Sequence, residues 1–350
     1  MSGLIRGMPG HVRLALQLAV TLALLALLWR AAGGPEAARS LASADLGWLA
    51  LALGTLTVQT ILSALRWQLT ARQFGIRIGL GTAIHEYYLS QVVNQSLPGG
   101  VVGDAGRAMR SRSQAGLMPA GQAVIFERLA GQVAMFAMLG LAFAATWTVP
   151  GGLDWPRPLA GPLALLLAAS LCLPFLVTML RRLPGPIGRS TERITTGFRM
   201  SLGTGRVLTA QVALSIGTVL CNIAAFGFCL WAVGAQIGIP ALCALVPLIL
   251  TTMLIPVSIS GWGLREGAAA ALLPIAGVAA SDALAGSVAF GLTYLASVLP
   301  GALLPALNSR PAGGETGDRP GQSTHGGPAP ACRLESPQGP PSLDETTGRT

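Results

Sequence analysis

The segment NQSLPGGVVGDAGRAMR, residues 94–110, decides the fold that this sequence predicts. It contains one proline, a pair of adjacent glycines and three charged residues, whereas the long segments on either side of it are mostly apolar. Proline and glycine interrupt helices, so the segment predicts a break between two helical stretches. The second stretch carries Asp104 and Arg107 directly after the break, an unusual place for charge in an apolar chain.

The composition is that of an integral membrane protein. Of the 350 residues, 52% are hydrophobic and 11% are charged, whereas soluble domains carry about 25% charged residues. All 23 basic residues are arginine, and the net charge of +9 is attributed to membrane topology and not to nucleic-acid binding. The five cysteines form no CxxC pair, so neither a disulfide framework nor a zinc site is expected.

Six segments are predicted to span the membrane, because a spanning helix needs roughly 20 apolar residues. They cover residues 14–29, 46–65, 129–149, 159–180, 207–233 and 283–307. The first segment also fits a signal peptide, but a retained span is favoured because so many spans follow it. Residues 309–350 are rich in Gly, Pro and Ser and are predicted to be a disordered polar tail.

The distribution of arginine orients the chain in the inner membrane. Arg6 and Arg13, before the first span, and the arginines of the loop 181–206 place the N-terminus (residues 1–12), this loop and the C-terminal tail in the cytoplasm. Arg66 and the arginines after it are interpreted as following the second span, on the cytoplasmic side. Both flanks of residues 80–106 are then cytoplasmic, so this segment is predicted to be a re-entrant hairpin that breaks at Pro98.

A second break repeats the first at a constant offset of 158 residues. In IPVSISGWGLREG, residues 255–267, three positions match the first segment: Pro256 corresponds to Pro98, Gly261 to Gly103, and Arg265 to Arg107. Each half of the chain, residues 13–150 and 159–308, has three spans, so the second half is inverted and its hairpin, residues 239–280, enters from outside. The predicted fold is an all-α polytopic membrane protein with about six transmembrane helices and two re-entrant broken-helix hairpins in an inverted repeat, as in many transporters. The alternative is that both breaks are ordinary loops between spans.

The two breaks are predicted to form an anion site. A helix that restarts after a break presents free N–H groups and a positive dipole end. Arg107 and Arg265 each follow a glycine by one helical turn, and arginine binds phosphate through two parallel hydrogen bonds. Asp104 and Glu266 would compensate the arginines in the empty site. The alternative is that both arginines only anchor the fold at the membrane surface.

The sequence also resembles a known family. The stretches NQSLPGGVVGDAGRA, FERLAGQ at 126–132 and IPVSISGWGLREG are similar to signature stretches of the lysylphosphatidylglycerol synthase transmembrane region, also called a flippase-like domain. The resemblance covers about residues 10–308. It implies handling of lipids with polar headgroups, such as phospholipids, hopanoids or polyprenyl-linked sugars. Because no soluble aminoacyl-transferring domain is expected in the tail, synthase activity is not predicted.

The residues predicted to bind the lipid headgroup come mainly from this resemblance. Glu127 is interpreted either as a countercharge for Arg107 or as part of an ordinary interfacial pair, and Ser258 and Ser260 either as phosphate donors or as partners of broken-helix carbonyls. The full set is Asn94, Pro98, Gly99, Gly100, Gly103, Asp104, Arg107, Glu127, Arg128, Pro256, Ser258, Ser260, Gly261, Gly263, Arg265 and Glu266. We expect Arg107→Gln and Arg265→Gln each to abolish headgroup binding with little loss of folded protein.

Three classes of function remain open at this stage. The favoured one is a protein that binds an anionic or polyprenyl-phosphate type of lipid and flips or transports it, with membrane lipids as its partners. The second is an intramembrane transferase with Asp104 or Glu127 as the base, and the third is a non-transporting partner of a cell-envelope lipid or glycan biosynthesis enzyme. The chain has no lysine and therefore no Walker A motif, so an ATP-driven motor is not predicted. No cofactor, metal or catalytic residue is predicted either. The sequence does not indicate an oligomeric state.

Overall fold

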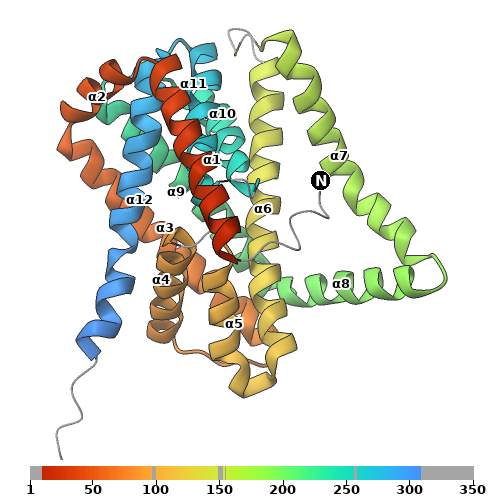
Figure 1. Cartoon of the computed structure of the whole chain (residues 1–350). Coiled ribbons are helices and arrows are strands. Elements are labelled where there is room, and N and C mark those ends of the chain that lie inside the picture. Colours follow the sequence, from red (N-terminus) through yellow and green to blue (C-terminus); the bar gives the residue numbers. More distant parts are fainter. Residues whose placement is uncertain (1–9, 97–99, 149–152, 154, 256–257, 309–350) are drawn as a thin grey trace, which may run out of the picture. The chain divides into compact units, whose positions relative to one another are not determined.

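The computed structural model describes residues 10–96, 100–148, 153, 155–255 and 258–308 (Figure 1). In this part of the chain every regular element is a helix. Five helices are long and apolar enough to cross a membrane, and a sixth span is reached if α1 and α2, which meet at 92°, are counted as one. The elements are α1 (Gly10–Ala31), α2 (Gly34–Ala42), α3 (Leu46–Gln73), α4 (Leu80–Ser96), α5 (Val102–Ala115), α6 (Leu117–Thr148), α7 (Arg157–Arg181), α8 (Pro186–Leu202), α9 (Arg206–Ala232), α10 (Ile239–Thr251), η1 (Thr252–Leu254), η2 (Ile259–Gly261), α11 (Leu264–Leu272), η3 (Leu273–Ala276) and α12 (Ala280–Asn308). The chain is therefore an all-α polytopic membrane protein, as predicted.

The order of the helices repeats once along the chain. α1–α6 and α7–α12 each run as a long helix, a shorter one, a second long helix, two short helices around a break, and a final long helix. The equivalent helices α3 and α9 lie antiparallel. The N–H of Asp45 donates to the carbonyl of Ala232 at 2.9 Å near one end of the pair, and the side chain of Gln211 donates to Thr70 at 2.9 Å near the other. This antiparallel pairing is the arrangement that an inverted repeat requires.

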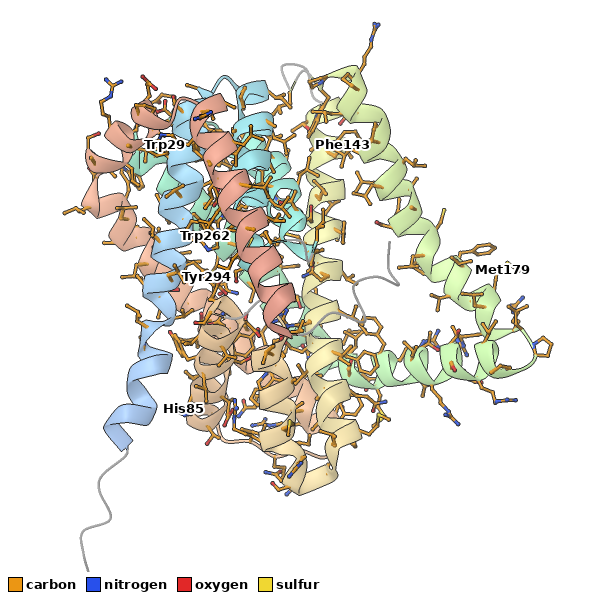
Figure 2. The ribbon with its side chains drawn as sticks, in the orientation of Figure 1. Trp29, His85, Phe143, Met179, Trp262 and Tyr294 are labelled. Atoms are coloured by element: carbon orange, nitrogen blue, oxygen red, sulfur yellow. The ribbon has the colours of Figure 1, made fainter. Side chains whose placement is uncertain are left out.

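The two predicted hairpins are both broken helices, and they approach each other from opposite ends of the bundle (Figure 1). α4 and α5 lie in the lower half of the view, whereas α10 and α11 lie in the upper half. The breaks meet where the hydroxyl of Ser260 in η2 donates to the carbonyl of Asn94 in α4 at 3.2 Å. Figure 2 shows Trp262, which follows η2, and Tyr294 of α12 at the middle level of the helices, while His85 lies toward the lower end.

Glycine provides the close approach and the turns that these hairpins need. A Cβ atom at Gly103 would overlap the carbonyl oxygen of Ser90, so α4 and α5 pack this closely only with glycine at that position. Gly261 and Gly263 have φ of 78° and 87°, a region that residues with a side chain rarely adopt. Pro98, Gly99 and Pro256 lie outside the described residues.

Two predicted span boundaries were wrong, and both errors concern charged residues. The second span does not end at residue 65, because α3 continues to Gln73 and contains Arg66 in its buried interior. The span predicted at 129–149 starts earlier, at Leu117, so Glu127 lies well inside α6 instead of at its beginning. Each of these charged residues was interpreted as the end of a span. In the structure the opposite charges of Arg66 and Glu127 are buried together and compensate each other.

The first span packs against the second hairpin and is part of the fold. A Cβ atom at Gly263 would lie 2.8 Å from the side chain of Leu24, and one at Gly267 would lie 3.5 Å from that of Leu28. α1 is therefore in direct contact with α11 and the turn before it. This contact supports a retained helix over a signal peptide.

Candidate functional site

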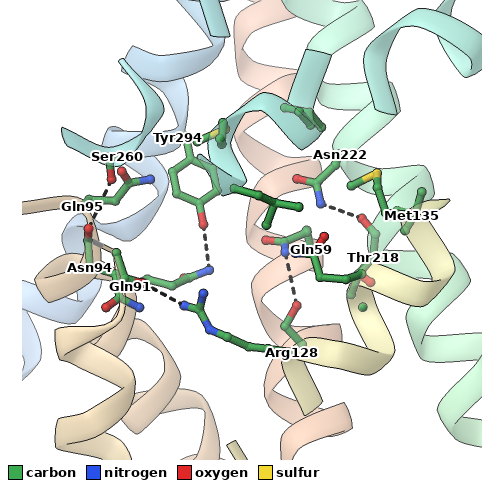
Figure 3. Close-up of a pocket in the computed structure, with 18 of the residues that line it drawn as sticks. Gln59, Gln91, Asn94, Gln95, Arg128, Met135, Thr218, Asn222, Ser260 and Tyr294 are labelled. Atoms are coloured by element: carbon green, nitrogen blue, oxygen red, sulfur yellow. Dashed lines mark hydrogen bonds between the residues drawn. The ribbon is translucent and has the colours of Figure 1, made fainter. Parts of the chain in front are cut away.

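A cavity of about 320 Å³ lies where the breaks of the two hairpins meet (Figure 3). Its walls come from α3, α4, α6, α9 and α12 together with the break segments, so residues far apart in the sequence converge on it. Most of the lining side chains are polar, in contrast to the apolar surface of the surrounding helices. The polar lining residues are Gln59, Ser63, Arg66, Tyr87, Ser90, Gln91, Asn94, Gln95, Asp104, Arg128, Gln132, Thr218, Asn222, Ser260, Arg265 and Tyr294.

The charge of the lining is positive. Three arginines, Arg66, Arg128 and Arg265, face one carboxylate, that of Asp104, among the described residues of the wall. The side chain of Arg128 is 46% exposed, whereas Arg66 and Arg265 are buried. Charge in a membrane interior is costly and generally marks a functional position.

Behind this wall, Glu127 joins two arginines into a buried network. Its carboxylate is fully buried and accepts hydrogen bonds from the Nε and Nη2 atoms of Arg66 at 3.0 and 2.6 Å. It also accepts one from Arg107 at 3.4 Å, so it is the countercharge for Arg107 that the sequence suggested. The other partner of Arg107 is Asp104, at 2.9 Å. Asp104 in turn pairs with Arg128, which completes the chain of charges.

The second hairpin carries a smaller version of this network. Arg265 is 3% exposed and pairs with the adjacent Glu266. It also donates to the hydroxyl of Ser287 on α12 at 3.1 Å. Glu266 accepts a further hydrogen bond of 2.6 Å from the N–H of Gly263 and so caps the start of α11. One carboxylate therefore fixes both the arginine and the helix that carries it.

Each hairpin arginine is also held by two aromatic rings. The guanidinium carbon of Arg107 lies 4.6 Å from the ring centre of Trp67 and 4.5 Å from that of Tyr87. Arg265 is placed in the same way, 5.1 Å from the ring of Trp262 and 5.3 Å from a second ring, that of Phe290. Such contacts stabilise a cation most where water is excluded.

The two arginines nevertheless differ in their relation to the cavity. Arg265 lines it, whereas Arg107, at 1% exposure, lies behind the wall. The N–H groups that were expected to point at an anion are also occupied, since that of Gly103 donates to the side chain of Asn94 at 2.8 Å and that of Gly263 donates to Glu266. The positive charge offered to a ligand therefore comes from the arginines and not from these helix ends.

The other predicted residues divide into three groups. Five of them line the cavity, namely Asn94, Gly100, Asp104, Arg128 and Ser260. A second group, Gly103, Gly261, Gly263, Glu127 and Glu266, supports the hairpins or the arginines from behind. Ser258 is buried, lies outside the lining and has a hydroxyl without a partner among the described residues.

Sequence reasoning missed Arg66 and most of the amides and tyrosines of the wall. The signal for Arg66 was the continuation of a helical segment through residues 66–73 without a proline or glycine. The amides on α3, α6 and α9 gave no signal, because they form no motif in the sequence, and only the packing of the helices shows that they face the same cavity.

The arrangement brings positive charge and many hydrogen-bonding groups together in one cavity. No group of three metal-ligating side chains occurs within the described ranges. A family model for the lysylphosphatidylglycerol synthase TM region matches residues 14–301. This range includes both hairpins and the long helices, except the first residues of α1 and the end of α12. A comparison with curated proteins finds no match.

Proposed function

Because the chain belongs to the lysylphosphatidylglycerol synthase TM region family, we propose that it binds a lipid with an anionic headgroup in the cavity between its hairpins and moves it across the membrane. The observation that carries this proposal is that three arginines reach the lining. Together with the groups behind the wall, four arginines are paired with three carboxylates, which leaves an excess of one positive charge. A phosphate group would compensate this charge. Arginine recognises phosphate through paired hydrogen bonds.

The surroundings of the cavity suit a lipid better than a soluble anion. Leu250, Met253 and Leu254 of the second break form part of the lining, next to the arginine-rich wall. Leu254 and the adjacent Ile255 are each about half exposed, at 49% and 50%. An anionic headgroup in the cavity could therefore leave its acyl chains along an apolar rim, where their burial is favourable.

The inverted arrangement of the hairpins supports transport and not binding alone. The two breaks come from opposite ends of the bundle and meet at the cavity, which is the architecture of transporters that expose one site alternately to each side. Each hairpin carries an arginine next to a carboxylate, and the second hairpin brings Arg265 into the lining. A headgroup could pass between Arg128 of α6 and Arg265, because both line the same cavity.

We also propose an orientation in the inner membrane, with both termini of the membrane domain in the cytoplasm. One end of the bundle carries many arginines and few acids, whereas arginines and acids are balanced at the other end. The basic end includes Arg72, Arg77, Arg110, Arg112, Arg189, Arg193, Arg199 and Arg206, and the balanced end includes Arg30, Arg39, Arg157, Glu36, Asp45 and Asp282.

The transferase alternative receives less support from the geometry. A general base needs a carboxylate that is free to accept a proton from the substrate. Glu127 is paired with Arg66 and Arg107, and Asp104 accepts from Ser90, Asn94 and Arg107 while pairing with Arg128. Both carboxylates are engaged in the fold, so lipid movement without chemical change is the function proposed.

The proposal is tested by mass spectrometry of the lipids that copurify with the wild type, with Arg128→Gln and with Arg265→Gln. We expect one anionic lipid class to be enriched in the wild type and depleted in both variants, while Arg112→Gln, an exposed arginine outside the lining, keeps the wild-type pattern. The same bulk lipid mixture in all four proteins would refute the binding site. It would favour a role as a partner of another membrane protein.

A further inference from the structure

Six amide side chains line the cavity, and they indicate what the headgroup carries besides its phosphate. They belong to Gln59, Gln91, Asn94, Gln95, Gln132 and Asn222, and come from α3, α4, α6 and α9. An amide has one acceptor oxygen and two N–H donors, so it matches a hydroxyl group, which both donates and accepts. A phosphate diester only accepts hydrogen bonds, so it has no use for the acceptor oxygens of six amides.

Two of these amides are free to bind a ligand. The side chains of Gln95 and Gln132 have no hydrogen-bonding partner within the part of the chain that the structure describes, whereas the other four are held by neighbouring groups. Gln95 lies beside Ser260 at the meeting point of the hairpins (Figure 3), and Gln132 comes from α6, one helical turn beyond Arg128. Gln132 is therefore close to Arg128, whose side chain is the most exposed of the three arginines in the described lining, and Gln95 lies beside the second hairpin.

The same cavity offers little to a positively charged headgroup. Its described lining has one carboxylate, and Asp104 already accepts from Ser90, Asn94 and Arg107 and pairs with Arg128. Aromatic rings can bind quaternary ammonium groups, but the rings of Tyr87 and Phe290 are already stacked on Arg107 and Arg265. The third ring of the described lining, that of Tyr294, lies against Phe290 with 6.2 Å between the ring centres. Each of the three arginines of the wall already pairs with a carboxylate, so an amine-bearing headgroup would find no free counterion in the described lining.

From this lining we infer that the lipid carries an uncharged, hydroxyl-rich group on its phosphate, such as a glycerol, an inositol or a sugar, and that Gln95 and Gln132 recognise its hydroxyls. The inference rests on the proposed function, because it assigns the arginines to the phosphate. The cavity volume of about 320 Å³ is at the low end for ligand sites, which suits one headgroup with its acyl chains outside.

The test compares lipids that differ only in the group on the phosphate. Dissociation constants for the full chain in detergent are measured by native mass spectrometry with dioctanoyl phosphatidylglycerol, phosphatidylethanol and phosphatidylethanolamine. Phosphatidylglycerol and phosphatidylethanol have the same charge, but only phosphatidylglycerol has hydroxyls on the group attached to its phosphate. We expect the wild type to bind phosphatidylglycerol about tenfold more tightly than phosphatidylethanol, since each hydrogen bond to a hydroxyl contributes roughly a factor of two to ten. Phosphatidylethanolamine should bind more weakly than phosphatidylethanol.

The matched variant is Gln95→Met/Gln132→Met, which removes both free amides and keeps side chains of similar length. We expect its preference for phosphatidylglycerol to fall to within about twofold, while its affinity for phosphatidylethanol stays at the wild-type value and shows that the cavity is intact. sn-Glycerol 3-phosphate, which has the polar groups but no acyl chains, should bind at least about tenfold more weakly than phosphatidylglycerol.

Four results would overturn the inference. Equal binding of phosphatidylglycerol and phosphatidylethanol by the wild type, with binding lost in Arg128→Gln, would leave the phosphate site in place and remove the hydroxyl selectivity. Equal weakening of both lipids in the double variant would show that the amides only maintain the fold. Binding of sn-glycerol 3-phosphate as tight as that of the lipid would assign the cavity to a soluble phosphate. Absence of binding by every lipid would remove the proposed function and the inference with it.

Discussion

The hydroxyl of Ser260 donates a hydrogen bond to the carbonyl oxygen of Asn94, 166 residues away in the sequence, and this contact joins the breaks of the two hairpins. Asn94 lies in the last turn of α4, where carbonyl groups lack partners within the helix. Ser260 supplies that partner from a left-handed backbone conformation, with φ of 50°, that is uncommon for a residue with a side chain. Such conformations persist at functional sites where the surrounding structure holds them.

Loss of the Glu127 carboxylate should destabilise the protein strongly. Glu127→Gln leaves Arg66 and Arg107 without their shared countercharge, and breaking a buried ion pair on one side costs about 3–5 kcal/mol. We expect this loss in the free energy of unfolding in detergent, measured by tryptophan fluorescence. The control is Glu36→Gln, which breaks an exposed pair with Arg39 and should change stability by less than about 1 kcal/mol. Equal values for the two variants would contradict the buried network.

Arg128→Gln should weaken lipid binding while the protein stays folded. The side chain of Arg128 is 46% exposed and faces the cavity, and Asp104 keeps its pairing with Arg107 when Arg128 is removed. A charge-assisted hydrogen bond contributes roughly 1.5–3 kcal/mol, so the dissociation constant for an anionic lipid should rise at least about tenfold. Lipid titrations and thermal unfolding of the same preparation check both parts. An unchanged dissociation constant would exclude Arg128 from the site.

The burial of Arg107 changes the expectation for that residue. The sequence predicted that Arg107→Gln abolishes binding with little loss of folded protein, but Arg107 lies behind the cavity wall, where it joins Asp104 to Glu127 and stacks on Trp67. We now expect the variant to lose about 3 kcal/mol or more of stability. The yield of monodisperse protein, compared with that of Arg112→Gln, measures this loss. A fully stable variant that no longer binds lipid would restore the earlier prediction.

Gly103→Ala should open the first hairpin. The added methyl group would overlap the carbonyl of Ser90, and a collision with backbone is relieved only by moving α4 and α5 apart. Overpacking of this kind costs about 1–3 kcal/mol and should also disturb the cavity, which both helices line. The control is Gly81→Ala, since a Cβ atom at Gly81 in α4 has no neighbour within 4 Å. Wild-type stability and lipid binding in Gly103→Ala would show that the close approach is not required.

The inverted topology predicts labelling from opposite sides of the membrane. In a variant whose five cysteines are replaced, Ser190→Cys on α8 should react with an impermeant maleimide only from the cytoplasm. Gln236→Cys, exposed in the connection between α9 and α10, should react only from the outside. Labelling of spheroplasts before and after permeabilisation distinguishes the two. Reaction of both positions from the same side would rule out the inversion.

Much of the fold was predictable because the hydrophobicity of successive residues along the chain indicates which segments form long apolar helices. Apolar length identified the long helices, the arginines suggested their direction, and the glycine and proline breaks located both hairpins with Arg107 and Arg265 in equivalent places. The errors occurred where a charge is buried. Arg66 and Glu127 were taken as span ends because a single charged residue in an apolar helix is unfavourable. The sequence does not show that Nη2 of Arg66 lies 2.6 Å from Oε1 of Glu127.

By itself, the sequence determined that the chain is a helical membrane protein of this family, with two broken helices that each carry an arginine behind a glycine. Only the tertiary structure decided which arginines face a ligand. Arg265 lines the cavity, Arg107 is closed off by Asp104, Glu127 and two aromatic rings, and the unpredicted Arg66 joins the wall from α3. The physical reason is that the cost of burying a charge depends on its partners, and those partners come from other helices.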